Sequence, residues 1–238
     1  MQRHPESTRV RMCLAASVHF RALPAEDLDR VAGLCRVSAL EDGRLLYHAR
    51  SELDRFWIVL SGSLRIFSTD EGDEFVYALL GPGAFFGLSY LLSRRQLAVA
   101  ASAYGATEVA AVDGTSFLAL LDRSPRLWRH VGGLLADRLN LAMMVVRDLS
   151  NAPLRKRIVR RLLGQGISGG RDLGAGARVE LRVTQSDLAA MLGTSRSKMN
   201  AELKQLEKER LIEVGYRTIA LANLEGLREI AGPDLFAF

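Results

Sequence analysis

The side chains best suited to chemistry in this sequence lie between Val183 and Leu206, and the chemistry that they indicate is recognition rather than catalysis. Hydrogen-bond donors gather directly after Gly193, led by Arg196 and Asn200. An arginine can donate two bonds to guanine and an asparagine can pair with adenine, so these donors are typical of a helix that reads base edges. The predicted DNA-contacting residues are Thr184, Gln185, Ser195, Arg196, Ser197, Lys198, Asn200, Lys204 and Arg217.

Two short helices must position these donors. Thr184 is predicted to cap a helix that begins near Gln185, and Gly193 supplies the left-handed turn that ends it. Ser195 is predicted to cap a second helix, whose residues Met199, Leu203 and Leu206 share one apolar face. The pattern predicts a helix-turn-helix with its donors on the recognition helix. An ordinary helical hairpin with a solvated basic face is the alternative.

The residues around this pair predict a small sheet. Two strands, 211–215 and 218–222, are separated by two residues, as in a β-hairpin. A third strand is expected at 179–183, and a short helix at 223–231. The C-terminal region, 151–238, is therefore predicted to be a winged helix-turn-helix domain.

The net charge of +5 is divided unevenly along the chain. Residues 1–150 contain 17 basic and 17 acidic residues, whereas residues 151–238 contain 15 basic and 10 acidic residues. A neutral body with a basic C-terminal domain is expected of a protein that neutralises phosphates. The alternative is a soluble surface with no such partner.

The N-terminal region is predicted to be an effector domain, residues 1–123, of α+β class. Helices are expected at 11–23 and 23–35, the second with Pro24 at its first position. Eight short segments rich in branched and aromatic residues follow between Arg36 and Gly114, and 85–92 is one of them. Their spacing predicts an antiparallel β-roll, or jelly roll. The uncharged stretch 75–93 is interrupted by Gly81 and Pro82, which argues against a membrane helix.

Residues 124–150 are predicted to form one long dimerisation helix. Apolar residues recur at alternating spacings of four and three, which is the seam of a two-stranded coiled coil. The predicted dimer contacts are Trp128, Leu135, Leu139, Ala142, Val146 and Leu149. A second stripe, which includes Leu127, Val131, Leu134, Leu141 and Val145, could pack on the β-domain. The alternative is a helix buried on both sides within one chain.

A hinge at 150–152 is expected to lead into a helix that starts at Pro153. Its basic face includes Arg155, Lys156, Arg157, Arg160 and Arg161, and we expect these residues to contact DNA phosphates without regard to sequence. A flexible loop is expected over 166–177.

This order of parts resembles the CRP/FNR superfamily of bacterial transcription regulators. The strings that carry the resemblance are LPAEDLDRVA (23–32), RFWIVLSGSLRIF (55–67), LLGPGAFFG (79–87) and TQSDLAAMLGTSRSKMN (184–200). The resemblance implies a homodimer that binds a palindromic operator in double-stranded DNA and contacts RNA polymerase. It also implies an effector site in the β-roll.

The effector site departs from the pattern of the family's members that bind cyclic AMP. Their Gly-Glu pair corresponds here to Gly87-Leu88, followed by Ser89, and their phosphate-binding Arg-Ser pair falls within Leu97-Ala98-Val99. The polar residues that meet the adenine align with Ala142 and Met143. A buried phosphate needs charge-assisted donors, so we expect no response to cyclic AMP and leave the effector open. Arg94 and Arg95 are nearby, and we expect them to be solvated.

The sequence offers no ligand set for other cofactors and no catalytic residues. Cys13 and Cys35 cannot supply the four ligands of an iron–sulfur cluster, and the histidines are isolated, with His130 on the long helix the best candidate for a role. No catalytic motif or metal-ligand set is present, so we expect neither an enzyme nor a metal site. A cytoplasmic location is expected. The rival function is a regulatory module that acts through a protein partner.

Overall fold

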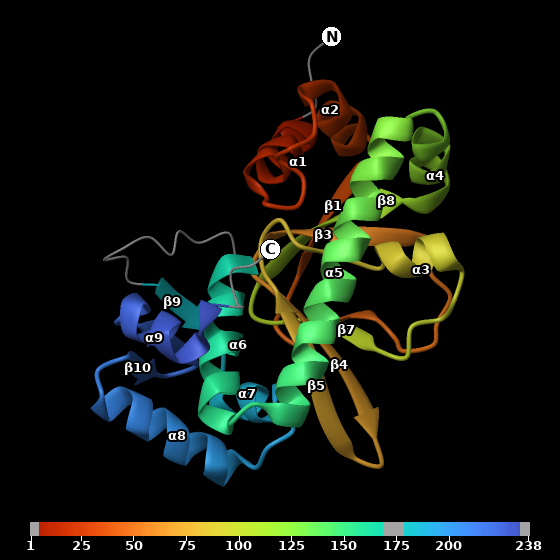
Figure 1. Ribbon diagram of the computed structural model, residues 1–238. Coiled ribbons are helices and arrows are strands. Elements are labelled where there is room, and N and C mark those ends of the chain that lie inside the picture. Colours follow the sequence, from red (N-terminus) through yellow and green to blue (C-terminus); the bar gives the residue numbers. More distant parts are fainter. Residues whose placement is uncertain (1–4, 169–178, 234–238) are drawn as a thin grey trace. The chain divides into compact units, whose positions relative to one another are not determined.

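The computed structural model describes residues 5–168 and 179–233 (Figure 1). The chain divides into two compact units, Met1–Ser68 with Tyr77–Arg138 and Thr69–Val76 with Leu139–Phe238. Among the described helices, none has the length and apolar run that crossing a membrane requires.

The first part of the chain forms a β-roll preceded by two helices, which confirms the predicted α+β class. The helices are α1 (Pro5–Ala16) and α2 (Ala25–Gly33). One sheet has the order β1 (Cys35–Leu40), β8 (Thr107–Asp113), β3 (Arg55–Ser61), β6 (Phe85–Phe86), and the other β2 (Leu45–Tyr47), β7 (Ala100–Ala103), β4 (Leu64–Asp70), β5 (Asp73–Leu80). The ladders that join β1, β3, β6 and β8, and those that join β2, β4 and β7, are antiparallel.

The roll buries side chains on both sides of its strands. On β3, Phe56 and Ile58 enter one apolar cluster with Phe85 and Leu88, here called the helix-side cluster. Trp57 and Val59 enter another with Tyr47, Leu64 and Phe86, here called the roll-interior cluster. Successive residues of a strand point to opposite faces, so one short strand supplies both clusters.

Three details of the N-terminal prediction are wrong. The segment 85–92 is not a single strand, because β6 ends at Phe86 and α3 (Leu88–Ser93) follows. Gly87 has a φ of +96°, which no strand accommodates. The first helix begins at Pro5 rather than near Arg11, and Pro24 precedes α2 as its N-cap.

A further helix, α4 (Gly114–Asp122), falls outside the sequence prediction. The Asp113 carboxylate caps it by accepting a hydrogen bond from Ser116 N at 2.8 Å. Because β8 runs directly into α4, no turn signal separates the two elements.

The long helix is α5 (Pro125–Asn151), within one residue of its predicted limits. Leu127, Val131 and Leu134 are buried in the helix-side cluster, as predicted for this stripe, but Leu141 of the same stripe is 53% exposed. In contrast, Leu139 and Val146 are 63% and 59% exposed. The alternative of a helix buried on both sides in one chain is therefore wrong.

The C-terminal part has the predicted winged helix-turn-helix order. After α6 (Leu154–Ser168) come β9 (Val179–Arg182), α7 (Gln185–Met191), α8 (Arg196–Lys208), β10 (Ile212–Gly215), β11 (Thr218–Leu221) and α9 (Leu224–Ala231). The three strands form an antiparallel sheet with β11 in the centre. The first residues of the predicted loop at 166–177 continue α6 to Ser168, and residues 169–177 lie outside the described ranges.

Candidate nucleic-acid interface

Side-chain caps define the N-terminal ends of α7 and α8. Thr184 Oγ1 accepts a hydrogen bond from Asp187 N at 3.0 Å and donates to Asp187 Oδ2 at 2.5 Å. Gly193 has a φ of +56° and turns the chain, and Ser195 Oγ then accepts from Lys198 N at 3.3 Å. Both helices therefore start, and the first helix ends, where the sequence predicts.

One face of α8 anchors the helix. Met199, Leu203 and Leu206 are fully buried, as is Leu188 on α7. Anchoring at three points along α8 fixes its rotation about its own axis. The opposite face is consequently held outward in a defined orientation.

That outward face carries the predicted donors. Ser195, Arg196, Ser197, Lys198 and Lys204 are exposed, and Asn200 is half-buried. An exposed arginine in the first turn of α8 can extend to a base edge, and the asparagine one turn later lies on the same side. The helix can thus present both a guanine-reading and an adenine-reading group.

Thr184 and Gln185 occupy a different position, at the start of α7. The Thr184 hydroxyl is committed to the helix cap in both its donor and acceptor capacities. Gln185 is half-buried at the first residue of α7. Thr184 therefore caps α7, in addition to the DNA contact that the sequence predicts for it.

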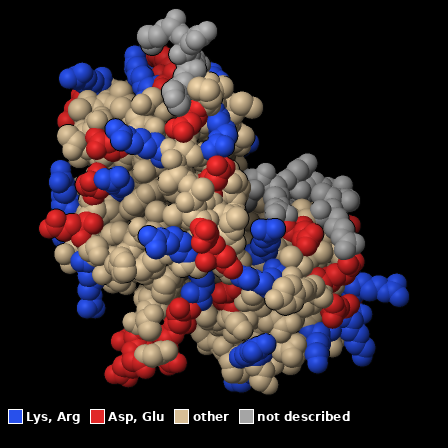
Figure 2. Space-filling model, turned by 180° about the vertical axis from the view of Figure 1, so that it is seen from behind, with Lys and Arg blue, Asp and Glu red and all other residues tan. Residues whose placement is uncertain are grey.

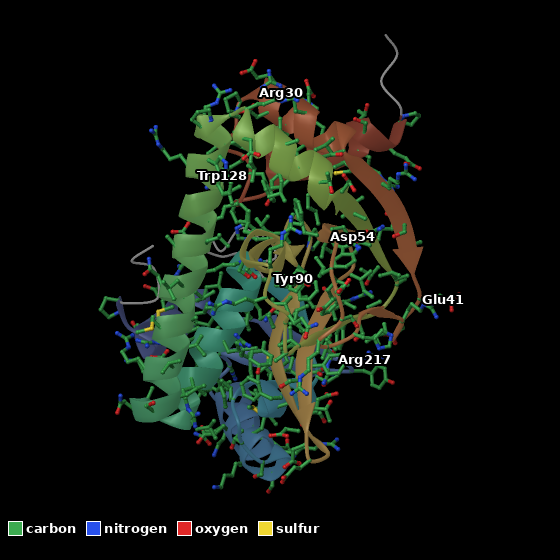
Figure 3. The ribbon with its side chains drawn as sticks, turned by 90° about the vertical axis from the view of Figure 1, so that its right-hand side faces the viewer. Arg30, Glu41, Asp54, Tyr90, Trp128 and Arg217 are labelled. Carbon is green, nitrogen blue, oxygen red and sulfur yellow. The ribbon has the colours of Figure 1, made fainter. Side chains whose placement is uncertain are left out.

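The wing contributes Arg217 and a residue that the sequence reasoning missed. Gly215 pairs with Thr218, so Tyr216 and Arg217 form the tip of a two-residue hairpin. Arg217 is labelled in Figure 3. Arg217 is exposed with a φ of +56°, and its carbonyl accepts from Val183 N at 3.1 Å. Tyr216 is 92% exposed, and an aromatic residue in a two-residue turn was the available signal.

The arginines of the basic face predicted for α6 are engaged with other residues of the same chain. Arg155 forms an ion pair with Glu209, Arg157 Nη1 donates to Leu192 O at 3.1 Å, and Arg160 Nη1 donates to Asp148 Oδ1 at 2.5 Å. Arg161 Nε approaches Met191 Sδ at 3.2 Å, and burial lowers the pKa of Arg161 to about 10. These four arginines, predicted to contact DNA phosphates, therefore have partners within the chain on α5, α7 and the end of α8, and their contact with DNA stays a prediction.

Basic side chains do not form a single band on the surface in Figure 2. Lysine and arginine are interspersed with aspartate and glutamate over the face shown. This face therefore carries no continuous band of positive charge.

The residues predicted to form the effector site lie in two different environments. Leu88 is 1% exposed in the helix-side cluster, and Ser89 beside it is exposed. Leu97 and Val99 pack instead against the roll-interior cluster, and Ala98 is exposed. The residues that correspond to the ribose and phosphate contacts thus supply hydrocarbon and do not share one cluster.

The remaining residues of this predicted site offer no substitute. Gly87 is buried, and a Cβ there would meet Leu53 Cδ1 at 3.3 Å. Arg94 and Arg95 are exposed, as predicted. Ala142 and Met143 are exposed on α5, in the second unit. These residues do not fit a cyclic nucleotide.

The predicted dimer seam is accessible along the single chain. Trp128, labelled on α5 in Figure 3, is 40% exposed, Leu139, Ala142 and Val146 are also exposed, and Leu135 and Leu149 are half-buried. A Cβ at Gly132, in the same seam, would meet no atom within 4 Å. Neighbours within the chain therefore give no reason for glycine at this position.

The other singled-out residues have local partners. His130 Nε2 lies 2.8 Å from His19 O, at a shallow groove of about 520 Å³ that both residues line. Burial lowers the pKa of His19 to about 4. Cys13 Sγ donates to Val59 O at 3.5 Å, and burial raises the pKa of Cys35 to about 12. Across residues 5–168 and 179–233, no group of three His, Cys, Asp or Glu side chains could hold a metal ion.

Comparisons with known proteins agree with this arrangement. A family model described as Crp-like helix-turn-helix domain matches residues 156–230, and one described as cyclic nucleotide-binding domain matches residues 37–124. The cyclic AMP receptor protein of Thermus thermophilus is 30% identical over 216 residues, which cover 89% of this chain and 95% of that protein. The HTH-type transcriptional regulator Cmr of Mycobacterium tuberculosis is 29% identical over 206 residues, with coverages of 87% and 80%. A solved transcriptional regulator of the CRP/FNR family from Thermus thermophilus superimposes with a TM-score of 0.65 at 25% identity, and covers 82% of this chain and 98% of its own.

Proposed function

Because the chain belongs to the CRP/FNR superfamily of DNA-binding transcription regulators, we propose that it acts as a homodimer on a two-fold palindromic operator. The observation that carries this proposal is the outward polar face of α8, fixed in rotation by Met199, Leu203 and Leu206. A DNA-reading function needs such a rigid helix, because its donors must be held at fixed positions against base edges.

We assign base reading to Arg196 and Asn200. Their side chains lie one turn apart on α8, at the spacing at which neighbouring base pairs can be addressed. Lys198, Lys204 and the wing residue Arg217 would contact phosphates and so set the position of the domain on DNA. RNA polymerase is the proposed protein partner.

Dimerisation would occur through the heptad seam of α5. Leu139 and Val146 expose large apolar surfaces in the single chain, and residues at this spacing pack as knobs into holes between two parallel helices. A two-fold dimer would present two copies of α8 to half-sites about one helical turn apart, roughly 34 Å.

We further propose that cyclic AMP does not regulate this protein. Several relatives have cyclic AMP in their names, but here Leu88, Leu97 and Val99 supply packed hydrocarbon at the positions where the resemblance predicts polar groups. Burying a phosphate against these side chains would leave its charge uncompensated.

The test is selection of bound duplexes from a random DNA pool, with and without cyclic AMP. We expect recovery of a palindrome whose half-sites contain guanine opposite Arg196, and the same sequences and affinities in both arms. Recovery of no common sequence, or a strictly monomeric protein, would contradict the operator proposal. A tenfold gain in affinity with cyclic AMP, about 1.4 kcal/mol, would contradict only the effector proposal.

A further inference from the structure

A buried ion pair crosses the junction between α5 and α6. Arg160 Nη1 donates to Asp148 Oδ1 at 2.5 Å, and the two side chains are only 6% and 13% exposed. Asp148 lies in the last turn of α5 and Arg160 in the second turn of α6, with Ala152 and Pro153 between the helices. Both partners belong to the second compact unit.

Arg160 also binds a third element. Its Nε donates to Ala231 O at 2.8 Å, and Ala231 is the last residue of α9. The final carbonyls of a helix have no partner within the helix, and a cation is favourable there. One guanidinium therefore joins α5, α6 and α9.

The covalent junction does not itself hold the two helices at one angle. Pro153 has no N–H to continue the hydrogen-bond ladder of α5. Ala152 N bonds back to Asp148 O and Arg157 N bonds to Pro153 O, so these bonds complete the separate helices rather than link them. A side-chain bond across the junction is the kind of contact that can fix the angle.

We propose that the Asp148–Arg160 pair is a clamp that holds the winged domain (Leu154–Ala231) at one angle to α5, and thereby sets the half-site spacing that the dimer accepts. The inference rests on the proposed dimeric, DNA-binding function. A buried ion pair adds little net stability, but its loss leaves a charge without its partner, so it favours one geometry over others.

The first test measures tolerance to spacing. Wild-type protein and Asp148→Asn are titrated with the palindrome selected by the wild type, and with versions whose central spacer is one base pair longer or shorter. We expect the wild type to lose about tenfold in affinity on each altered spacer, and Asp148→Asn to lose less than about threefold. An equal spacing penalty in the two proteins would overturn the clamp.

The matched control is Glu209→Gln. It removes the acid of the Arg155–Glu209 ion pair, which joins α6 to the end of α8 inside the winged domain and does not cross the junction. Its spacing profile should equal that of the wild type. A profile as tolerant as that of Asp148→Asn would overturn the assignment of spacing to the Asp148–Arg160 pair.

A second measurement does not depend on DNA. A spin label is attached to Lys204→Cys in a protein whose own cysteines are replaced by Cys13→Ser and Cys35→Ala. Pulsed electron paramagnetic resonance then measures the distance between the labels on the two copies of α8. We expect a narrow distance distribution in the otherwise wild-type protein and a broad one with Asp148→Asn. A narrow distribution in both would overturn the clamp, whereas the absence of any intermolecular distance in the wild-type background would count against the dimer itself.

Discussion

At the scale of single residues, Arg196 carries the most specific prediction. It is exposed at the first position of α8, and its bidentate geometry suits guanine. Arg196→Ala should cost about 1–3 kcal/mol on the selected operator and much less on random duplex. Fluorescence anisotropy titrations on both duplexes measure the difference, with Lys208→Ala as an exposed control on the same helix. Equal losses on the two duplexes would show that Arg196 binds phosphate only.

Thr184 illustrates a residue whose position in the structure changes its expected role. Since its hydroxyl both donates to and accepts from Asp187, Thr184→Ala should destabilise the winged domain by about 1 kcal/mol. Ser197→Ala, on the exposed face of α8, should leave stability within about 0.5 kcal/mol of the wild type. Thermal unfolding of both variants makes the comparison, and an equal melting temperature for the two would contradict the capping role.

At the scale of elements, the sequence correctly predicted the helices and strands whose limits are marked by hydrophobic periodicity and capping residues. The limits of α5, α7 and the wing, and the start of α8, follow from apolar spacing, Ser and Thr caps and glycine turns. The strand prediction over 85–92 failed because an apolar run does not distinguish a strand from a short buried helix after Gly87. The surroundings of the α6 arginines were missed for a different reason. Arg160 and Arg161 find tertiary partners that no local pattern reveals.

Two leucines of α5, one inside the heptad seam and one outside it, allow a test of the dimer interface. Leu139 and Leu141 are 63% and 53% exposed on the same helix, but only Leu139 lies in the seam. Leu139→Lys should therefore raise the dimer dissociation constant by at least about tenfold, because it places two like charges face to face, whereas Leu141→Lys should not. Sedimentation equilibrium measures both constants. Dissociation by both substitutions, or by neither, would refute this seam.

At the scale of the whole molecule, the net charge belongs to the C-terminal domain, but most of its α6 arginines are engaged internally. The number of phosphate contacts should therefore be smaller than the number of basic residues suggests. Each lysine that binds a phosphate contributes about 0.9 to the slope of log K against log salt on B-form DNA.

Because the dimer loses one lysine from each subunit, Lys204→Gln should consequently lower the magnitude of that slope by about two, and Arg155→Gln should leave it unchanged, because Arg155 already faces Glu209. Titrations of random duplex at several salt concentrations give both slopes. The two substitutions remove the same charge from the same domain, so net charge alone predicts equal effects. A reduced slope for Arg155→Gln would mean that DNA displaces Glu209 from the ion pair, and would restore α6 to the phosphate-binding surface.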